Sequence, residues 1–140
     1  YSKNRGVINK IIDRAISEKK IILYGDGNYV RDFIYLEDVI MGIICALKNC
    51  NKLQKDYYYL TTEIGKSFND LEKIINSELY KIYKFTAKVK YKKWPNTSTM
   101  LDKRSFVGNS FLFKKVTGWK PKYNLRSAIR HYICCKKNKS

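Results

Sequence analysis

The chain has few of the residues from which catalytic and metal sites are usually built. Its 140 residues include one histidine, 12 acidic residues and two prolines. No nucleophile and base occur at helical or elbow spacing, so the chain taken alone contains no complete catalytic site. The longest run of apolar residues and glycine, Val39–Leu47, is much shorter than the roughly 20 residues that cross a membrane. The N-terminus also lacks the apolar stretch of a secretory signal. We therefore expect no catalytic residue, no membrane segment and no secretion signal.

Cysteine is also sparse and forms no disulfide pattern. Cys45, Cys50, Cys134 and Cys135 show no recurring spacing, and the adjacent pair cannot easily bond to each other. Reduced thiols are the default in a cytosolic protein, so we expect a cytoplasmic location. His131 precedes the last two cysteines by three and four residues, so the three could share a helix face as metal ligands. Because no fourth ligand is evident, we expect no metal.

Acidic residues are outnumbered, and the formal net charge is +17. Such a charge can indicate a nucleic-acid or anionic-membrane partner. However, there are 23 lysines and only 6 arginines, and phosphate recognition favours the planar fork of arginine. Abundant Lys, Asn, Ile and Tyr are typical of an AT-rich coding sequence, and we favour this compositional explanation. Residues 1–70 carry +2 and residues 71–140 carry +15, so a polyanion surface, the alternative, would lie in the second half.

What is present suffices for a folded core. Apolar residues make up 44%, with 12 Tyr, 6 Phe and 2 Trp. Helical periodicity, capping residues and strand-like alternation predict a chain in which strands and helices alternate, hence the α/β class. Helices are expected over about 6–18, 37–47, 68–79, 110–116 and 125–135, and strands or extended pieces over 21–23, 33–35, 56–60 and 81–93. Gly25–Asn28 is expected to form a turn, because glycine and asparagine tolerate a positive φ. Ser67 followed by Asp70 predicts a variant of the capping box at the start of the helix over 68–79. A frayed basic tail is expected over 136–140, and the start at Tyr1 rather than Met suggests a fragment.

Four segments together resemble one enzyme family. Leu23–Val39 reads LYGDGNYVRDFIYLEDV and resembles the "(I/V)YGDGxxxRDF(I/V)YVxD" stretch of the extended short-chain dehydrogenases, the NAD(P)-dependent nucleotide-sugar epimerases and dehydratases. Ser67–Leu71 is similar to the family's "SxxEL" helix start, Lys115–Pro121 to its "xLGWxP", and Leu125–Ile129 to the helix that follows. The order and spacing fit, and the resemblance spans nearly the whole chain.

The resemblance implies that residues 1–140 are the C-terminal, substrate-binding part of a Rossmann-type fold whose N-terminal cofactor-binding half is absent. Gly25 and Gly27 lack the third glycine of a dinucleotide fingerprint, and no Tyr-x-x-x-Lys pair stands in the right place. The resemblance thus implies that NAD or NADP binds to the missing half and that the ligand of this part is a nucleotide-diphosphate sugar. It also implies a possible homodimer of the intact enzyme. The chain alone would be inactive.

Two arginines match positions that contact the substrate diphosphate in that family. Arg31 lies in the first motif, where a guanidinium on a short strand can donate two hydrogen bonds to phosphate oxygens. An ion pair with Asp32 is the alternative. Arg104 matches, less closely, a second arginine about fourteen residues before the Gly-Trp pair.

Three further residues match positions near the nucleobase. Tyr24 and Ile22 could sandwich a base between a ring and an aliphatic side chain, with ordinary strand packing as the alternative. Val7 matches a base-proximal position at the start of the first helix, with core packing as the alternative.

Other matched residues are expected to support the fold. Asp38 can cap the helix that it opens, Asp32 can fix the turn, and Trp119 can bury its indole against the last helices. Tyr80 is expected in the core at a helix end.

The chain also departs from the family pattern. Where the family reads "YN(I/L)GxG", residues 58–63 read YYLTTE, so both glycines are replaced, by Thr61 and Glu63. Glu63 is expected to bring a negative charge near the diphosphate. A non-catalytic divergent remnant is therefore one alternative function, and a basic nucleic-acid-binding module, for which no motif speaks, is another.

Overall fold

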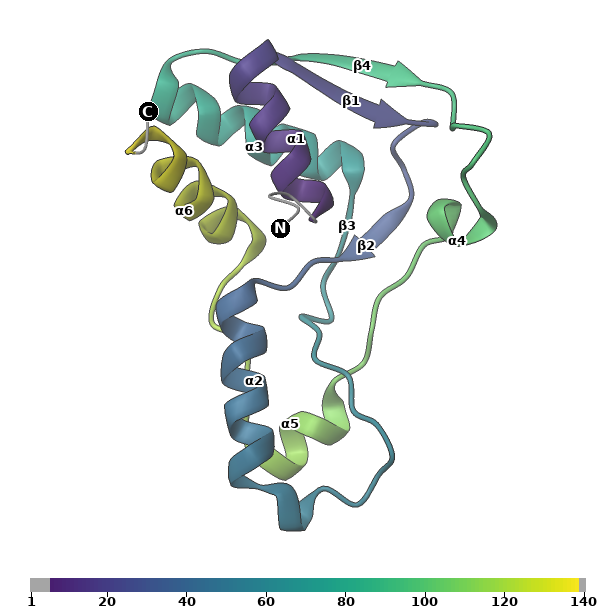
Figure 1. Cartoon of the computed structure of the whole chain (residues 1–140), viewed down its shortest axis with the longest axis vertical. Coiled ribbons are helices and arrows are strands. Elements are labelled where there is room, and N and C mark those ends of the chain that lie inside the picture. The colour runs from purple at the N-terminus through teal and green to yellow at the C-terminus, as the bar shows by residue number, and fades with distance from the viewer. Residues whose placement is uncertain (1–5, 139–140) are drawn as a thin grey trace. The chain divides into compact units, whose positions relative to one another are not determined.

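The computed structural model describes residues 6–138, which form two compact units. The first unit comprises residues 6–29, 67–104 and 126–138, and the second comprises 30–66 and 105–125. Figure 1 labels the elements along the chain. They are α1 (Val7–Glu18), β1 (Lys20–Tyr24), β2 (Val30–Asp32), α2 (Leu36–Lys48), the 3-10 helix η1 (Cys50–Lys52), β3 (Gly65–Ser67), α3 (Phe68–Tyr83), β4 (Lys88–Lys92), α4 (Met100–Lys103), α5 (Phe111–Thr117) and α6 (Leu125–Lys137).

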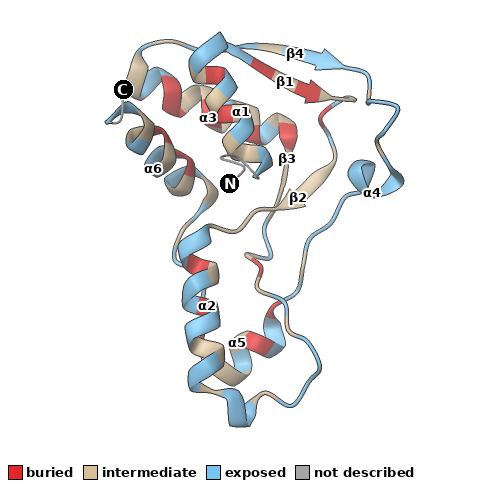
Figure 2. Ribbon diagram, viewed as in Figure 1, coloured by how far each residue is buried: buried red, intermediate tan, exposed pale blue. Residues whose placement is uncertain are grey.

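The first unit is built around a parallel pair of strands, β1 and β4. Ile21 lies opposite Val89 and Leu23 opposite Tyr91, and Ile21 and Leu23 are fully buried. Because strand side chains alternate between faces, β1 presents its other residues on the opposite face. The buried face joins a core with the inner sides of α1 and α3, shown in red in Figure 2. That core contains Ile12, Ala15, Leu71, Ile75 and Leu79.

Helix α3 begins at the capping box that the sequence predicts. The Ser67 hydroxyl accepts a hydrogen bond from the backbone N–H of Asp70 (3.0 Å), and the Asp70 carboxylate accepts from the backbone N–H of Ser67 (3.2 Å). These bonds satisfy two donors that a helix N-terminus otherwise leaves unpaired. The helix ends four residues later than predicted, at Tyr83, where Lys84 takes a left-handed conformation (φ 61°). Tyr80 is 59% exposed, so its expected place in the core is wrong.

The second unit is organised by a buried carboxylate near the start of α2. Asp38 is 2% exposed and accepts hydrogen bonds from the backbone N–H groups of Lys122 (2.7 Å) and Tyr123 (3.1 Å). Its own carbonyl accepts from the indole N–H of Trp119 (3.1 Å), which is itself buried beside Phe113 of α5. The expectation that Asp38 caps α2 is therefore wrong, because its oxygens instead bind the segment after α5.

Helix and turn positions agree with the sequence better than strand positions do. The expected strand at 56–60 is absent, because no described residue pairs with this segment. The segment is not buried throughout either, since Tyr57 is 71% exposed. The expected strand over 81–93 is reduced to β4, since 81–83 complete α3. The extended piece expected at 33–35 lies three residues earlier, as β2, and α4 was not expected. Helix α6 includes Lys136 and Lys137 of the expected tail, whose last two residues lie outside the described range.

A buried acidic residue connects α3 to α6 within the first unit. Glu78 is fully buried, and its two oxygens lie 2.7 Å from Arg126 Nη1 and 2.7 Å from Arg130 Nε. Burial would raise the pKa of the Glu78 carboxyl, but hydrogen bonds from Arg130 and Arg126 outweigh it and lower the pKa to about 2. The ionised carboxylate is thus part of the folded state.

Replacing Glu78 with Gln is expected to lower the free energy of unfolding at neutral pH by roughly 3 kcal/mol, because two guanidinium groups lose a buried partner. In the unmodified chain, a folded-state pKa below the unfolded value means that Glu78 stabilises the fold above about pH 4.5 and loses this effect as the pH falls toward 2. Denaturant unfolding of the two chains at neutral pH measures the first effect, and unfolding of the unmodified chain between pH 4.5 and pH 2 measures the second. The matched control is Glu18→Gln, which removes only an exposed pair with Arg14 and should change stability by less than about 1 kcal/mol. Equal effects of the two substitutions would contradict the assignment.

Thr61 supplies a second test of the packing. Its side chain is buried, its hydroxyl has no hydrogen-bond partner, and a Cβ on Gly108 would lie 2.2 Å from its methyl carbon. Thr61→Val keeps the shape and removes the unpaired hydroxyl, so it should stabilise the chain by about 1 kcal/mol. Thr61→Ser keeps the hydroxyl and loses the methyl, so it should destabilise. Thermal unfolding of the two variants should give melting temperatures that shift in opposite directions, and shifts of the same sign would contradict this description.

Candidate functional site

A glycine turn ends β1 at the edge where β4 also ends. Gly25 and Gly27 have positive φ angles (63° and 72°), which residues with a Cβ adopt at a cost. The Gly25 N–H donates to the carbonyl of Lys92 (2.9 Å) and so continues the β1–β4 pairing by one residue. Asp26 accepts from the backbone N–H of Asn28 (3.0 Å), which closes the turn. The predicted turn is confirmed, and it marks the carboxyl end of the parallel pair.

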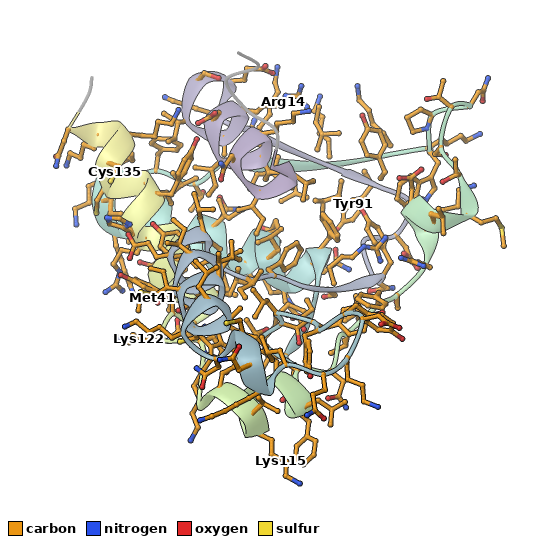
Figure 3. All side chains as sticks on the ribbon, turned by 60° about the horizontal axis from the view of Figure 1, so that its bottom comes forward. Arg14, Met41, Tyr91, Lys115, Lys122 and Cys135 are labelled. Carbon is orange, nitrogen blue, oxygen red and sulfur yellow. The ribbon has the colours of Figure 1, made fainter. Side chains whose placement is uncertain are left out.

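The turn is fixed to the first turn of α3. The Asn69 backbone N–H donates to the Gly27 carbonyl (3.1 Å), and its side-chain amide donates to the Asp26 carbonyl (3.0 Å). Tyr91, labelled in Figure 3, donates from its hydroxyl to Asn69 Oδ1 (3.0 Å). A Cβ on Gly27 would lie 2.3 Å from that same amide oxygen. A side chain at position 27 would therefore be strained by its φ and would also displace the Asn69 amide from this position.

Tyr24 and Ile22 lie together on the outer face of β1. Both are half-buried, whereas their neighbours Ile21 and Leu23 point into the core. The Tyr24 ring stacks on Trp94, with centroids 5.8 Å apart and planes at 26°. In α/β proteins, ligands bind outside the carboxyl ends of parallel strands, which is where this ring pair lies. Sequence reasoning missed Trp94, although its position two residues after β4 was a usable signal.

Val7 and Arg104, the other two candidates of the first unit, are exposed. Val7 is the first residue of α1 and is 47% exposed, so the alternative of core packing is wrong. Arg104 directly follows α4, and its backbone N–H donates to the Met100 carbonyl (3.1 Å). Neither position is taken up by the hydrophobic core.

Arg31 is half-buried on β2, in the second unit. Its Nη1 donates to the carbonyl of Val30 (3.0 Å). The expectation that the neighbouring Asp32 fixes the turn is wrong. Its carboxylate instead accepts hydrogen bonds from the backbone N–H groups of Thr62 (3.0 Å) and Glu63 (2.9 Å). Arg31 thus belongs to one unit and the other four candidates to the other, so a common site for all five stays a prediction.

The two residues that replace glycines are accommodated within the second unit. Glu63 keeps a positive φ (63°), a conformation that favours glycine. Its carboxylate lies 2.7 Å from the Lys114 ammonium and accepts from the Ser110 backbone N–H (2.7 Å) and hydroxyl (3.0 Å). The Lys114 and Ser110 hydrogen bonds lower the pKa of the Glu63 carboxyl. The charge that was expected to oppose a diphosphate is therefore paired with a cation.

The described residues do not provide a dinucleotide site or a metal centre. A dinucleotide fingerprint needs a glycine-rich turn between a strand and a helix, whose N-terminus faces the pyrophosphate. Here β1 is followed by the glycine turn and then by β2, so the residues present do not fit NAD or NADP. Within residues 6–138, no three His, Cys, Asp or Glu side chains gather as metal ligands. No helix in this range is long and apolar enough to span a membrane.

Known proteins resemble the chain over most of its length. It is 30% identical over 136 residues to a Methanocaldococcus jannaschii protein named "Putative UDP-glucose 4-epimerase", covering 95% of this chain and 39% of that protein. The solved structures that share its fold include two crystal structures of epimerases. One is the ADP-L-glycero-D-manno-heptose-6-epimerase of Helicobacter pylori (TM-score 0.77, 24% identity, covering 96% of this chain and 38% of that one). The other is the UDP-glucose 4-epimerase of Thermotoga maritima with UDP-glucose (TM-score 0.76, 23% identity, covering 96% of this chain and 40% of that one).

The chain thus spans about two fifths of the length of these relatives. Residues 1–60 match the family described as the NAD dependent epimerase/dehydratase family, and they include the whole of Leu23–Val39. The fold comparison confirms the expected partial α/β fold of the extended short-chain dehydrogenase type. The expected resemblance to the NAD dependent epimerase/dehydratase family is thus confirmed.

Proposed function

We propose that this chain is the nucleotide-sugar-binding portion of an NAD(P)-dependent epimerase or dehydratase and that it holds the nucleotide diphosphate. The observation that carries the proposal is the carboxyl end of β1 and β4, where the glycine turn leaves Tyr24 on an outer face that the core does not use. The Thermotoga maritima relative, which was crystallised with UDP-glucose, has the same fold over this region and supports a UDP-sugar as the ligand.

In the proposed site, two kinds of side chain contact two different parts of the ligand. Arg31 and Arg104 bind diphosphate oxygens, since a guanidinium can donate two parallel hydrogen bonds to a phosphate. Tyr24, Ile22 and Val7 contact the nucleobase, because an aromatic ring and aliphatic side chains suit its flat apolar faces. Binding and orientation of the substrate are therefore the contribution of this chain.

In this proposal, the chemical step is carried out by residues and a cofactor that this chain does not supply. The residues present supply neither a cofactor turn nor a catalytic pair, and the chain alone is expected to be inactive. NAD or NADP and the catalytic residues would belong to a part of the longer relatives that this chain does not cover. A cytoplasmic location and a homodimer of the complete enzyme remain part of the proposal, supported by the unpaired cysteines of the described chain and by the family resemblance.

Arg31→Ala is expected to weaken the binding of UDP-glucose to the 140-residue chain about tenfold or more, because a charge-assisted hydrogen bond to phosphate is lost. Isothermal titration calorimetry measures this change. Binding of uridine, which lacks phosphate, should be unaffected by the same substitution. The matched control is Arg14→Ala, since Arg14 is exposed and pairs with Glu18 on the same helix, α1. The proposed function fails if the chain binds neither UDP-glucose nor UDP, or if the two arginine variants behave alike.

A further inference from the structure

A row of lysines shares the outer face of the β1–β4 pair with Tyr24 and Ile22. The parallel register sets Lys90 opposite Ile22 and Lys92 opposite Tyr24. Since directly opposed residues in a sheet point to the same side, with Cβ atoms about 5 Å apart, these side chains are neighbours. The same register sets Lys20 opposite Lys88. The outer face therefore carries Ile22, Tyr24, Lys20, Lys88, Lys90 and Lys92.

These lysines are exposed, and no acidic side chain compensates them. Within residues 6–138, the ion pairs of lysine involve Lys81, Lys114 and Lys136, and none involves a lysine of this face. Like charges directly opposite each other destabilise a sheet. Lysine on an exposed strand can serve simply to prevent edge-to-edge aggregation. That explanation accounts for the charge but not for the aromatic pair at one end of the row.

The aromatic end of the row is rigidly supported. The Trp94 indole lies directly over Gly25, where a Cβ would come within 2.6 Å of its nitrogen. The ring also contacts Tyr29 (centroids 5.1 Å apart), which in turn packs on the buried Phe68 (4.4 Å). Trp94 itself is only half-buried, so part of the indole is accessible. An aromatic surface fixed in this way loses little freedom when a planar ligand stacks on it.

We propose that Trp94, Lys90 and Lys92 extend the nucleotide site: the base of a nucleoside diphosphate stacks on the Tyr24–Trp94 pair, and the two lysines bind its phosphates. This inference rests on the proposed function and adds three binding residues to it. The stacked rings and the lysines lie on one face, at the carboxyl end of two parallel strands. A lysine ammonium attracts phosphate as a flexible point charge, which suits a position beside the base rather than a bidentate contact.

Tryptophan fluorescence of the 140-residue chain provides a direct test, with UDP and uridine as ligands. The chain has two tryptophans, and Trp119 is 3% exposed in the core of the second unit. UDP is expected to change the emission saturably, and Trp94→Phe should abolish this signal. Calorimetry should show that Trp94→Phe weakens the binding of both UDP and uridine about tenfold, because the base of each ligand loses part of its stacking surface.

Lysine variants separate the phosphate contribution from the base. Lys92→Gln should weaken the binding of UDP several-fold and leave the binding of uridine unchanged. The effect on UDP binding should become smaller at high salt. The matched control is Lys73→Gln, because Lys73 is an exposed lysine on α3 of the same unit, away from this face. It should change the affinity for neither ligand.

The outcomes distinguish this inference from the proposed function. The inference is overturned and the proposed function stands if UDP binds and depends on Arg31, but neither Trp94→Phe nor Lys92→Gln changes the affinity for UDP and Trp94→Phe leaves the UDP-induced change in emission intact. If UDP and UDP-glucose do not bind at all, both fail. If a single-stranded oligouridylate binds more tightly than UDP with a steeper salt dependence, the lysine face is a nucleic-acid surface and the inference is overturned.

Discussion

The close approach of Trp94 to the backbone of Gly25 is the constraint on which the proposed site depends. Gly25 ends β1 with a positive φ, continues the hydrogen bonding to Lys92, and leaves room for the indole because it has no Cβ. Any larger residue would have to displace the ring as well as adopt a strained conformation. The ring in turn stacks on Tyr24, which strand alternation places on the outer face. One glycine therefore determines both where the strand stops and which aromatic surface stands at its end.

The family motif encodes structural support as well as candidate binding groups. Within Leu23–Val39, Asp32 and Asp38 use their carboxylates to bind backbone N–H groups about 30 and 85 residues farther along the chain. Such charge-assisted bonds are stronger than bonds between neutral groups. Asp32, which adjoins Arg31 on β2, thus holds the loop at Thr62 in place, and Asp38 holds the segment at Lys122. A specific sequence motif is therefore not by itself evidence that each of its charged residues touches a ligand.

The sequence was most informative where local rules decide the structure. Helical periodicity, the Ser67 capping box and the glycine turn are local, and each appears where it was predicted. The strand expected at 56–60 is absent because a strand also needs a neighbour, which its own residues cannot reveal. The same limit applies to the candidate site. Tyr24 and Ile22 were found from a motif, whereas Trp94 depends on pairing between segments about 70 residues apart.

The replaced glycines at 61 and 63 bear on whether the chain is a divergent remnant. An unpaired Glu63 carboxylate at a strained φ would be costly in two ways, yet it binds Ser110 and Lys114. The added bulk of Thr61 lies against Gly108, the one residue type that leaves room for its methyl group. Each change therefore has a partner elsewhere in the second unit that offsets it, although the buried Thr61 hydroxyl remains unsatisfied. Because the offsetting partners keep this loop ordered and pair its added charge with a cation, the substitutions are compatible with a diphosphate ligand. Any loss of binding in a remnant would therefore have to arise from the ligand contacts themselves and not from a loop that these replacements disrupt.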